Sequence, residues 1–147
     1  MSRLIYLDNA ATTKTAPEVV DAMIPYFTEH YGNPSSVYSF ASGNKEVVSR
    51  QREIIAQALG AQANEIYFTA GGSESDNWAL KATAEAYEKK GKHIITTKIE
   101  HHAILHTCEY LEKQRGFEIT YLDVDENGVV KLDELKKRFV RIRSLFL

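Results

Sequence analysis

The sequence predicts an α/β fold in which a mostly parallel sheet carries flanking helices. Short apolar stretches alternate with longer stretches whose apolar residues recur at helical spacing, and turn residues separate the two kinds. This alternation is typical of parallel strands joined by helical crossovers. The chain of 147 residues is 44% hydrophobic and 26% charged, which suffices for one domain with a core and argues against disorder throughout.

The first part of the chain is predicted to hold an extended segment and then a helix. Residues 5–7 are apolar, and the small polar residues 8–13 suit a segment that lies across a site. Thr15 and Glu18 are expected to form a capping box, with Pro17 in the first helical turn, where a missing N–H costs little. The predicted apolar face of this helix comprises Val19, Val20, Met23, Ile24 and Phe27.

A second, longer helix is predicted over residues 39–59. Pro25 is expected to kink the first helix, and the turn residues 32–36 separate the two helices. Apolar residues recur along one side of the second helix. Gly60 is its expected stop, because glycine readily adopts the left-handed conformation that ends helices.

Strands and helices then alternate along the chain. The predicted strands cover residues 66–69, 93–97 and 118–122. Helices over about residues 74–89 and 102–113 connect them. The order strand, helix, strand is the βαβ arrangement that defines a parallel sheet.

Turn residues and a short helix complete the pattern. Gly116 is expected to end the preceding helix, and Asn127 with Gly128 predicts a tight turn. Residues 132–138 resume as a helix. The cationic stretch 138–147 is interpreted as a tail and not as a binding site.

The loop Ala70-Gly71-Gly72-Ser73-Glu74-Ser75 lies between a predicted strand and a predicted helix, an order that can cradle an anion. Gly71 and Gly72 are expected to allow close approach and positive φ, and Ser73 adds a hydroxyl. The free N–H groups of the first helical turn point at the anion along the helix dipole. An ordinary turn from strand to helix is the alternative reading of the same loop.

Four segments occur in an order that characterises one family. They are LDNAATT at residues 7–13, YGNPSS at 31–36, AGGSES at 70–75 and TTKIEHHA at 96–103. Together they resemble the cysteine desulfurases of the NifS and IscS type, pyridoxal-phosphate enzymes of the class V aminotransferase group. The resemblance extends from about residue 4 to about residue 137.

The resemblance implies a fold, a cofactor and a reaction. Residues 1–147 would form a partial, incomplete large domain of a fold-type I pyridoxal 5′-phosphate enzyme, including its N-terminal segment. Gly72 and Ser73 would bind the cofactor phosphate. His101 would stack on the cofactor ring and act catalytically by moving protons, whereas an exposed histidine at a helix start is the alternative.

The implied reaction converts L-cysteine to L-alanine and passes sulfur to an enzyme cysteine as a persulfide, for iron–sulfur clusters or thio-cofactors. A homodimer and a sulfur-accepting scaffold protein are the implied partners. Alternatives are a selenocysteine lyase, another class V aminotransferase, or a non-catalytic domain that binds a phosphorylated ligand or a partner protein.

Family members are more than twice as long as this chain. Their Schiff-base lysine, the aspartate that faces the pyridine nitrogen and the sulfur-accepting cysteine all correspond to positions beyond residue 147. We therefore expect an N-terminal part that is inactive alone. Residues 138–147 diverge from the family, through a frameshift or early stop or as a genuine divergent strand.

Histidine, cysteine and glutamate side chains elsewhere in the sequence are further candidates for a metal site, a sulfur acceptor or a phosphate contact. His102 and His106 share a helical face, but Cys108 lies off it and no zinc motif completes the set, so no metal site is expected. Cys108 is interpreted as a small buried hydrophobe and not as the sulfur acceptor. Glu74 favours the helix dipole but would repel a phosphate unless it turned outward.

Three residues near the start of the chain lie within or beside the motifs of the resembled family. Asn9 and Asn33 are candidates for contacting substrate or the partner subunit's site, and turn chemistry explains both equally well. Tyr38 stands where many members of the resembled family have histidine.

Composition and motifs exclude several function classes. The formal net charge of −2 provides no basic field for nucleic acid, and aromatic residues lack basic interleaving. Neither a nucleoside-triphosphate loop nor a dinucleotide fingerprint is present. One cysteine fits a reducing compartment, and no stretch is suited to a signal peptide or a membrane span, so a cytoplasmic location is expected.

Overall fold

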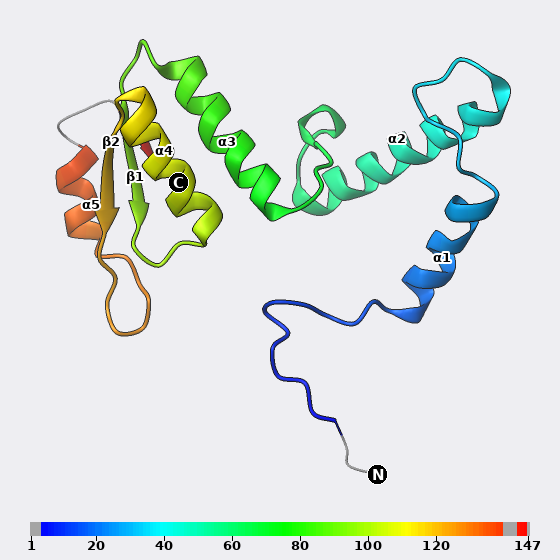
Figure 1. Ribbon diagram of the computed structural model, residues 1–147, viewed down its shortest axis with the longest axis horizontal. Helices are drawn as coiled ribbons and strands as arrows, with labels where there is room; N and C mark the ends of the chain where they lie inside the picture. Colours follow the sequence, from blue (N-terminus) through cyan, green and yellow to red (C-terminus); the bar gives the residue numbers. More distant parts are fainter. Residues whose placement is uncertain (1–3, 140–143, 147) are drawn as a thin grey trace. The chain divides into compact units, whose positions relative to one another are not determined.

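The computed structural model describes residues 4–139 and 144–146, and it divides the chain into two units, Met1–Tyr67 and Phe68–Leu147. The first unit contains helix α1 (Pro17–Thr28), helix α2 (Ser39–Leu59) and the short 3₁₀ helix η1 (Ala63–Glu65) (Figure 1). The predicted second helix is confirmed at both ends, because α2 stops at Gly60 in the left-handed conformation, with φ 68°.

The predicted capping box at the start of the first helix is wrong. A box on Thr15 requires the helix to begin one residue earlier than it does. Pro17 favours an extended conformation for Ala16, which has φ −63° and ψ 138° and becomes the N-cap without a side-chain hydrogen bond. The expected placement of Pro17 in the first turn is confirmed.

The first unit has little buried interior among its described residues. The loop before α2 is fastened to that helix by Asn44, whose Nδ2 donates to the carbonyls of His30 and Gly32 at 2.7 and 2.6 Å. A Cβ at Gly32 would meet the Ala41 Cα at 3.0 Å, so only glycine permits this approach. The predicted apolar face of α1 is exposed along its length, at Val19, Val20, Met23, Ile24 and Phe27.

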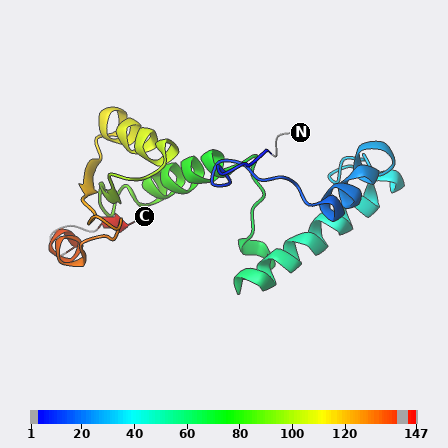
Figure 2. The same cartoon turned by 90° about the horizontal axis from the view of Figure 1, so that it is seen from below.

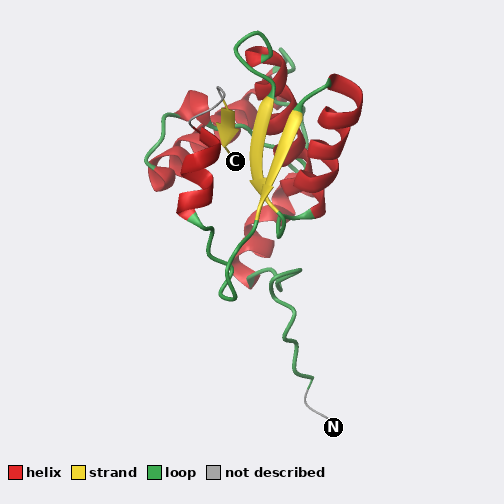
Figure 3. Cartoon of the chain, turned by 90° about the vertical axis from the view of Figure 1, so that its left-hand side faces the viewer, coloured by secondary structure: helices red, strands yellow, loops and turns green. Residues whose placement is uncertain are grey.

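The second unit contains a three-stranded parallel sheet. Strands β1 (His93–Thr97), β2 (Glu118–Leu122) and β3 (Ser144–Phe146) lie in the order β2-β1-β3, and their arrows point the same way in Figure 3. Two of the predicted strands and the parallel arrangement are therefore confirmed. In the predicted divergent tail 138–147, residues 140–143 and 147 lie outside the described residues.

The predicted strand at residues 66–69 does not form a ladder. Ile66 has extended backbone angles, φ −97° and ψ 127°, but its carbonyl accepts a hydrogen bond from the Arg52 guanidinium of α2. A β-strand requires backbone hydrogen bonds to a neighbouring strand as well as an apolar sequence. Residues 66–69 are mostly apolar but are not paired with any strand of the sheet β2-β1-β3.

Helices cover both sides of the sheet. Helices α3 (Gly72–Tyr87) and α4 (His102–Arg115) pack on one face, and α5 (Leu132–Phe139) lies on the opposite side of the strands from α4 (Figure 2). The expected stop at Gly116 is confirmed, with φ 69°. The expected turn at Gly128 is also confirmed, because its N–H donates to the Asp125 carbonyl at 3.0 Å.

The core of the second unit lies between the sheet and helices α3 and α4. All of its central side chains are buried. They are Leu80 and Ala84 of α3, Ile94 of β1, Cys108 and Leu111 of α4, and Phe117 before β2. This packing fixes the two helices against the strands.

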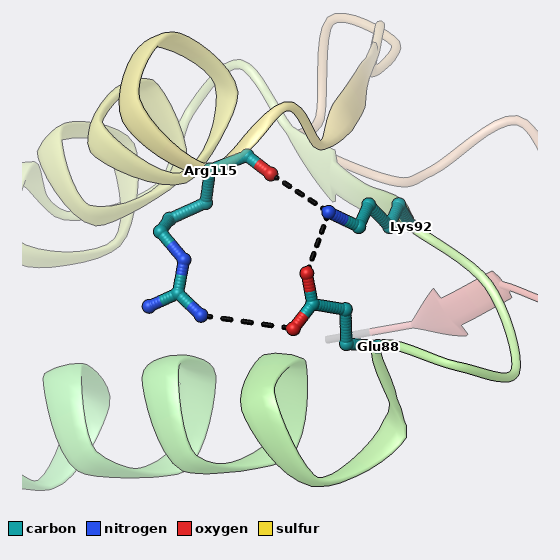
Figure 4. A network of polar contacts seen from close by, with 3 residues as sticks. All are labelled: Glu88, Lys92 and Arg115. Atoms are coloured by element: carbon teal, nitrogen blue, oxygen red, sulfur yellow. Dashed lines mark hydrogen bonds and ion pairs between the residues drawn. The ribbon is translucent and has the colours of Figure 1, made fainter.

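An ion-pair network joins the C-terminal ends of α3 and α4 (Figure 4). One carboxylate oxygen of Glu88 lies 2.6 Å from the Lys92 ammonium, and the other lies 3.7 Å from the Arg115 guanidinium. Lys92 also donates to the Arg115 carbonyl at 3.1 Å. The hydrogen bond from Lys92 and its charge lower the pKa of Glu88.

The helices in the described part of the chain are too short or too polar to cross a membrane.

Candidate functional site

Glu74 lies in the first turn of α3, at the N-terminus of that helix. Gly71 is the N-cap, and the Glu74 carboxylate turns back to accept the Ala70 backbone N–H at 2.5 Å. This hydrogen bond directs the carboxylate to the backbone of the preceding loop. The carboxylate therefore stays at the start of α3, where it favours the helix dipole.

The predicted positive φ at Gly71 and Gly72 is wrong. Gly71 has φ 161° and ψ 176°, which is extended backbone, and Gly72 already begins the helix. A Cβ on either residue would meet nothing within 4 Å. Neither backbone strain nor contact with neighbouring side chains therefore requires glycine at these two positions. The space beside their backbone is open to a ligand.

The first turn of α3 presents unused donors toward this space. The backbone N–H groups of Glu74 and Ser75 donate to the Gly71 carbonyl at 3.1 and 3.2 Å, so the helical bonds start there. The N–H groups of Gly72 and Ser73 precede that first bond. The Ser73 hydroxyl has no hydrogen-bond partner among the residues that the structure describes. By contrast, the Ser75 hydroxyl contacts Thr69 Oγ1 at 2.7 Å.

His101 is the N-cap of α4, and its ring is held by the backbone. Its Nδ1 accepts the Ala103 N–H at 3.1 Å, and its backbone is extended, with φ −61° and ψ 148°. Because Nδ1 is the acceptor, a neutral His101 carries its proton on Nε2. The ring is therefore oriented before any ligand arrives.

Helices α3 and α4 run in parallel, so their N-terminal ends lie together. Near their starts Asn77 bonds Thr107, and at their ends Glu88 pairs with Arg115. A shallow depression of about 460 Å³ opens between them, and Ser73 and His101 both contribute to its lining. Gly72 is not among the lining residues.

The depression has a basic and polar lining without a carboxylate. Lys81 of α3 contributes an ammonium that lies 5.0 Å from the centre of the Tyr110 ring. Asn77 and Lys81 follow Ser73 at intervals of four residues, which places all three on one face of α3. The spacing of four residues is visible in the sequence and is the signal by which Asn77 and Lys81 could have been found.

Two other candidates from the sequence lie close by. The rings of His102 and His106 stack with their centres 5.5 Å apart, and His106 Nδ1 lies 3.7 Å from a Glu109 oxygen. Within residues 4–139 and 144–146, no group of three or more potential metal ligands converges. Cys108 is fully buried, as expected, and burial followed by the charges of nearby glutamates raises its pKa to about 11.

Asn9 and Asn33 belong to the first unit, where their side chains bond their own turns. Asn33 Oδ1 accepts the Ser35 N–H at 2.9 Å, and Asn9 Nδ2 donates to the Tyr6 carbonyl at 3.5 Å. These local bonds agree with turn chemistry at both positions, and a contact with substrate or with a partner subunit stays a prediction. A second, open hollow lies along α2 in this unit, with Lys45, Arg50 and other charged residues of both signs on its lining.

Comparison with known proteins identifies relatives across nearly the whole chain. Residues 5–143 match the family described as aminotransferase class-V. The cysteine desulfurase IscS of Clostridium botulinum (strain Kyoto / Type A2) is 58% identical over 136 residues, which are 92% of this chain and 34% of that protein. The IscS of Methanosarcina thermophila is 57% identical over 135 residues, 92% of this chain and 33% of that protein.

Solved structures resemble the chain in the same way. A NifS-like protein superposes with a TM-score of 0.84 at 44% identity, covering 88% of this chain and 35% of that one. A structure of SspA in complex with cysteine gives a TM-score of 0.81 at 38% identity, covering 87% and 37%. The chain thus spans about a third of the length of the curated relatives it matches.

Proposed function

The chain belongs to the class-V aminotransferase family, and from this premise we propose that it supplies the phosphate-binding and ring-stacking part of a pyridoxal 5′-phosphate-dependent cysteine desulfurase. The observation that carries the proposal is the meeting of two parallel helix N-termini at one depression without carboxylates. Two aligned dipoles repel each other at that end, and a bound anion relieves the repulsion.

The residues on α3 suit the phosphate group. We propose that the N–H groups of Gly72 and Ser73 and the Ser73 hydroxyl donate hydrogen bonds to it. The open space before Gly72 admits an oxygen that a side chain would obstruct. Lys81, on the same face of the helix, adds positive charge to the depression.

His101 suits the ring of the cofactor. Its bond to the Ala103 N–H holds the imidazole in place and leaves Nε2 as the atom that can hold or release a proton. We propose that the ring stacks on the pyridine ring and that Nε2 takes part in proton transfer. Pyridoxal 5′-phosphate, when bound, supplies the electron sink that the side chains lack.

L-cysteine is the proposed substrate of the longer protein, since the relatives are named cysteine desulfurases and one solved neighbour is a complex with cysteine. The products would be L-alanine and a persulfide on an enzyme cysteine, from which sulfur reaches iron–sulfur clusters or thio-cofactors. We propose a homodimer, a scaffold protein as acceptor and a cytoplasmic location as further expectations of the family resemblance.

We propose that these 147 residues alone bind the cofactor without turning over cysteine. The chain has one cysteine, Cys108, which is fully buried and has a raised pKa. A thiol of this kind is neither accessible to a sulfur donor nor ionised at neutral pH. The depression itself is built from the second unit, which also supports the alternative of a non-catalytic domain that binds a phosphorylated ligand.

Calorimetric titration of the chain with pyridoxal 5′-phosphate, pyridoxal and inorganic phosphate tests the proposal. We expect the phosphorylated cofactor to bind at least about tenfold more tightly than pyridoxal, because one charge-assisted hydrogen bond contributes roughly 1.5 to 3 kcal/mol. Ser73→Ala should weaken only the phosphorylated ligand. Ser75→Ala is the matched control, because the Ser75 hydroxyl already contacts Thr69.

Equal affinity for pyridoxal and its phosphate would contradict the proposed phosphate site. Tight binding of inorganic phosphate with no gain from the pyridine ring would favour the phosphoryl-ligand alternative. Release of alanine from L-cysteine by the 147-residue chain would contradict the expected lack of turnover.

A further inference from the structure

The side chain of Asn77 connects the two helices that form the depression. Its Nδ2 donates to the Ser73 carbonyl at 2.9 Å, and its Oδ1 accepts the Thr107 hydroxyl at 2.8 Å. Thr107 is 3% exposed, and Asn77 is half-buried. Donor and acceptor of the amide are both used, so the orientation of the Asn77 amide is defined by its partners.

Both residue types are unusual choices for the interior of a helix. Asparagine and threonine side chains compete for backbone groups and lower helix propensity. A helical threonine commonly donates to a carbonyl one turn earlier, whereas Thr107 donates across to Asn77 of α3. The hydrogen bond between these two residues therefore stabilises the contact between the helices.

The pair lies at the end of the interface where the two helices begin. The core beside these helices contains Leu80, Ala84, Cys108 and Leu111. Ile104 of α4 packs against it, and the Glu88 ion pair lies at the far end. At the start of α3, a Cβ on Gly72 would meet nothing within 4 Å, so neighbouring side chains do not crowd that residue. The Asn77–Thr107 hydrogen bond crosses between the two helices one turn beyond Ser73.

We propose that Asn77 and Thr107 are positioning residues that hold the Ser73 end of α3 at a fixed distance from the His101 end of α4. The inference rests on the proposed function, since it concerns the same depression. Both residues line that depression, but their hydrogen-bonding groups are engaged with each other and with the Ser73 carbonyl. They would act by fixing the position of Ser73, whose backbone N–H and hydroxyl would donate hydrogen bonds to the ligand.

Thr107→Val tests the inference, because valine keeps the shape of threonine and removes the hydroxyl. We expect the affinity for pyridoxal 5′-phosphate to fall about three- to tenfold, the effect of one hydrogen bond. The affinity for pyridoxal, which lacks the phosphate, should stay within about twofold. Thr107→Ser, which retains the hydroxyl, should restore the preference for the phosphorylated ligand.

Asn77→Ala is the second variant and guards against loss of folding. Alanine raises the helix propensity of α3, so a loss of intrinsic helix propensity would not explain weaker binding. We expect the same selective loss of the phosphorylated ligand. Faster hydrogen exchange of the amides in the first two turns of α3, measured without ligand, should accompany it.

Three results would overturn the inference. In the first, Thr107→Val and Asn77→Ala leave the ratio of the affinities for pyridoxal 5′-phosphate and pyridoxal unchanged. In the second, Thr107→Ser loses the preference as Thr107→Val does. In the third, the variants lower the affinity for both ligands equally. If the unaltered chain shows no preference for the phosphate, the proposed function fails together with the positioning role. If the unaltered chain shows that preference and both variants keep it, only the positioning role fails.

Discussion

The two units of the chain differ in how far their apolar side chains are buried. In Phe68–Leu147, a parallel sheet and two helices enclose a core whose Leu80 is 0% exposed. In Met1–Tyr67, Ile24 on the apolar face of α1 is 51% exposed. A βαβ arrangement buries its helix faces against its strands, whereas the apolar face of α1 is exposed in the first unit. The proposed phosphate site accordingly lies in the unit that has a core.

Truncating one leucine or isoleucine in each unit should give the largest contrast. Leu80→Ala removes buried atoms and should lower the free energy of unfolding by about 2 to 5 kcal/mol. Ile24→Ala should change it by less than about 0.5 kcal/mol, because that side chain is already in contact with solvent. Urea unfolding followed by circular dichroism measures both values. Equal losses would show that α1 packs against a core in solution.

The reactivity of Cys108 reports on the second unit alone. Its pKa is raised to about 11 from an ordinary value of 9.0, so at pH 8 its thiolate fraction is about a hundredfold lower than in the unfolded chain. Alkylation with iodoacetamide should be slower by at least this factor in the native protein. Mass spectrometry with and without urea provides the comparison. Rapid alkylation of the folded chain would mean that the core of this unit opens readily.

Acid should weaken the second unit through the network at the helix ends. The pKa of Glu88 is lowered, chiefly by its hydrogen bond to Lys92, so the carboxylate stabilises the folded state above its ordinary pKa of 4.5. That contribution is lost as the pH falls through the lower folded-state value. Glu88→Gln should make the melting temperature less dependent on pH below 4.5. Because the network is exposed, the effect should be the smallest of these. An unchanged acid dependence would show that Glu88 contributes nothing.

The sequence predicted those parts of the fold that depend on local signals. Gly60 and Gly116 marked helix ends because left-handed caps need glycine, and alternation of strands and helices predicted the parallel sheet. The capping box at Thr15 failed because Pro17 shifts the helix start by one residue. Periodicity also identified the apolar face of α1, but it contains no information on what covers such a face.

The candidate site was predictable in part. Ser73 and His101 were found from their motifs, and the structure brings them to one depression. The positive φ expected at Gly72 was wrong, because that residue already belongs to the helix. The hydrogen bond between Asn77 and Thr107 joins residues 30 positions apart. It depends on the rotation of two helices against each other, which no local pattern specifies.

Mapping of backbone amide shifts during titration with pyridoxal 5′-phosphate tests whether an anion binds where α3 and α4 begin. We expect the largest shifts at Gly72 and Ser73, smaller shifts from His101 to Ala103, and little change at the Glu88 end of α3. Pyridoxal should not shift Gly72 and Ser73. Largest shifts along α2 of the first unit, or none at the start of α3, would contradict an anion site at these helix termini.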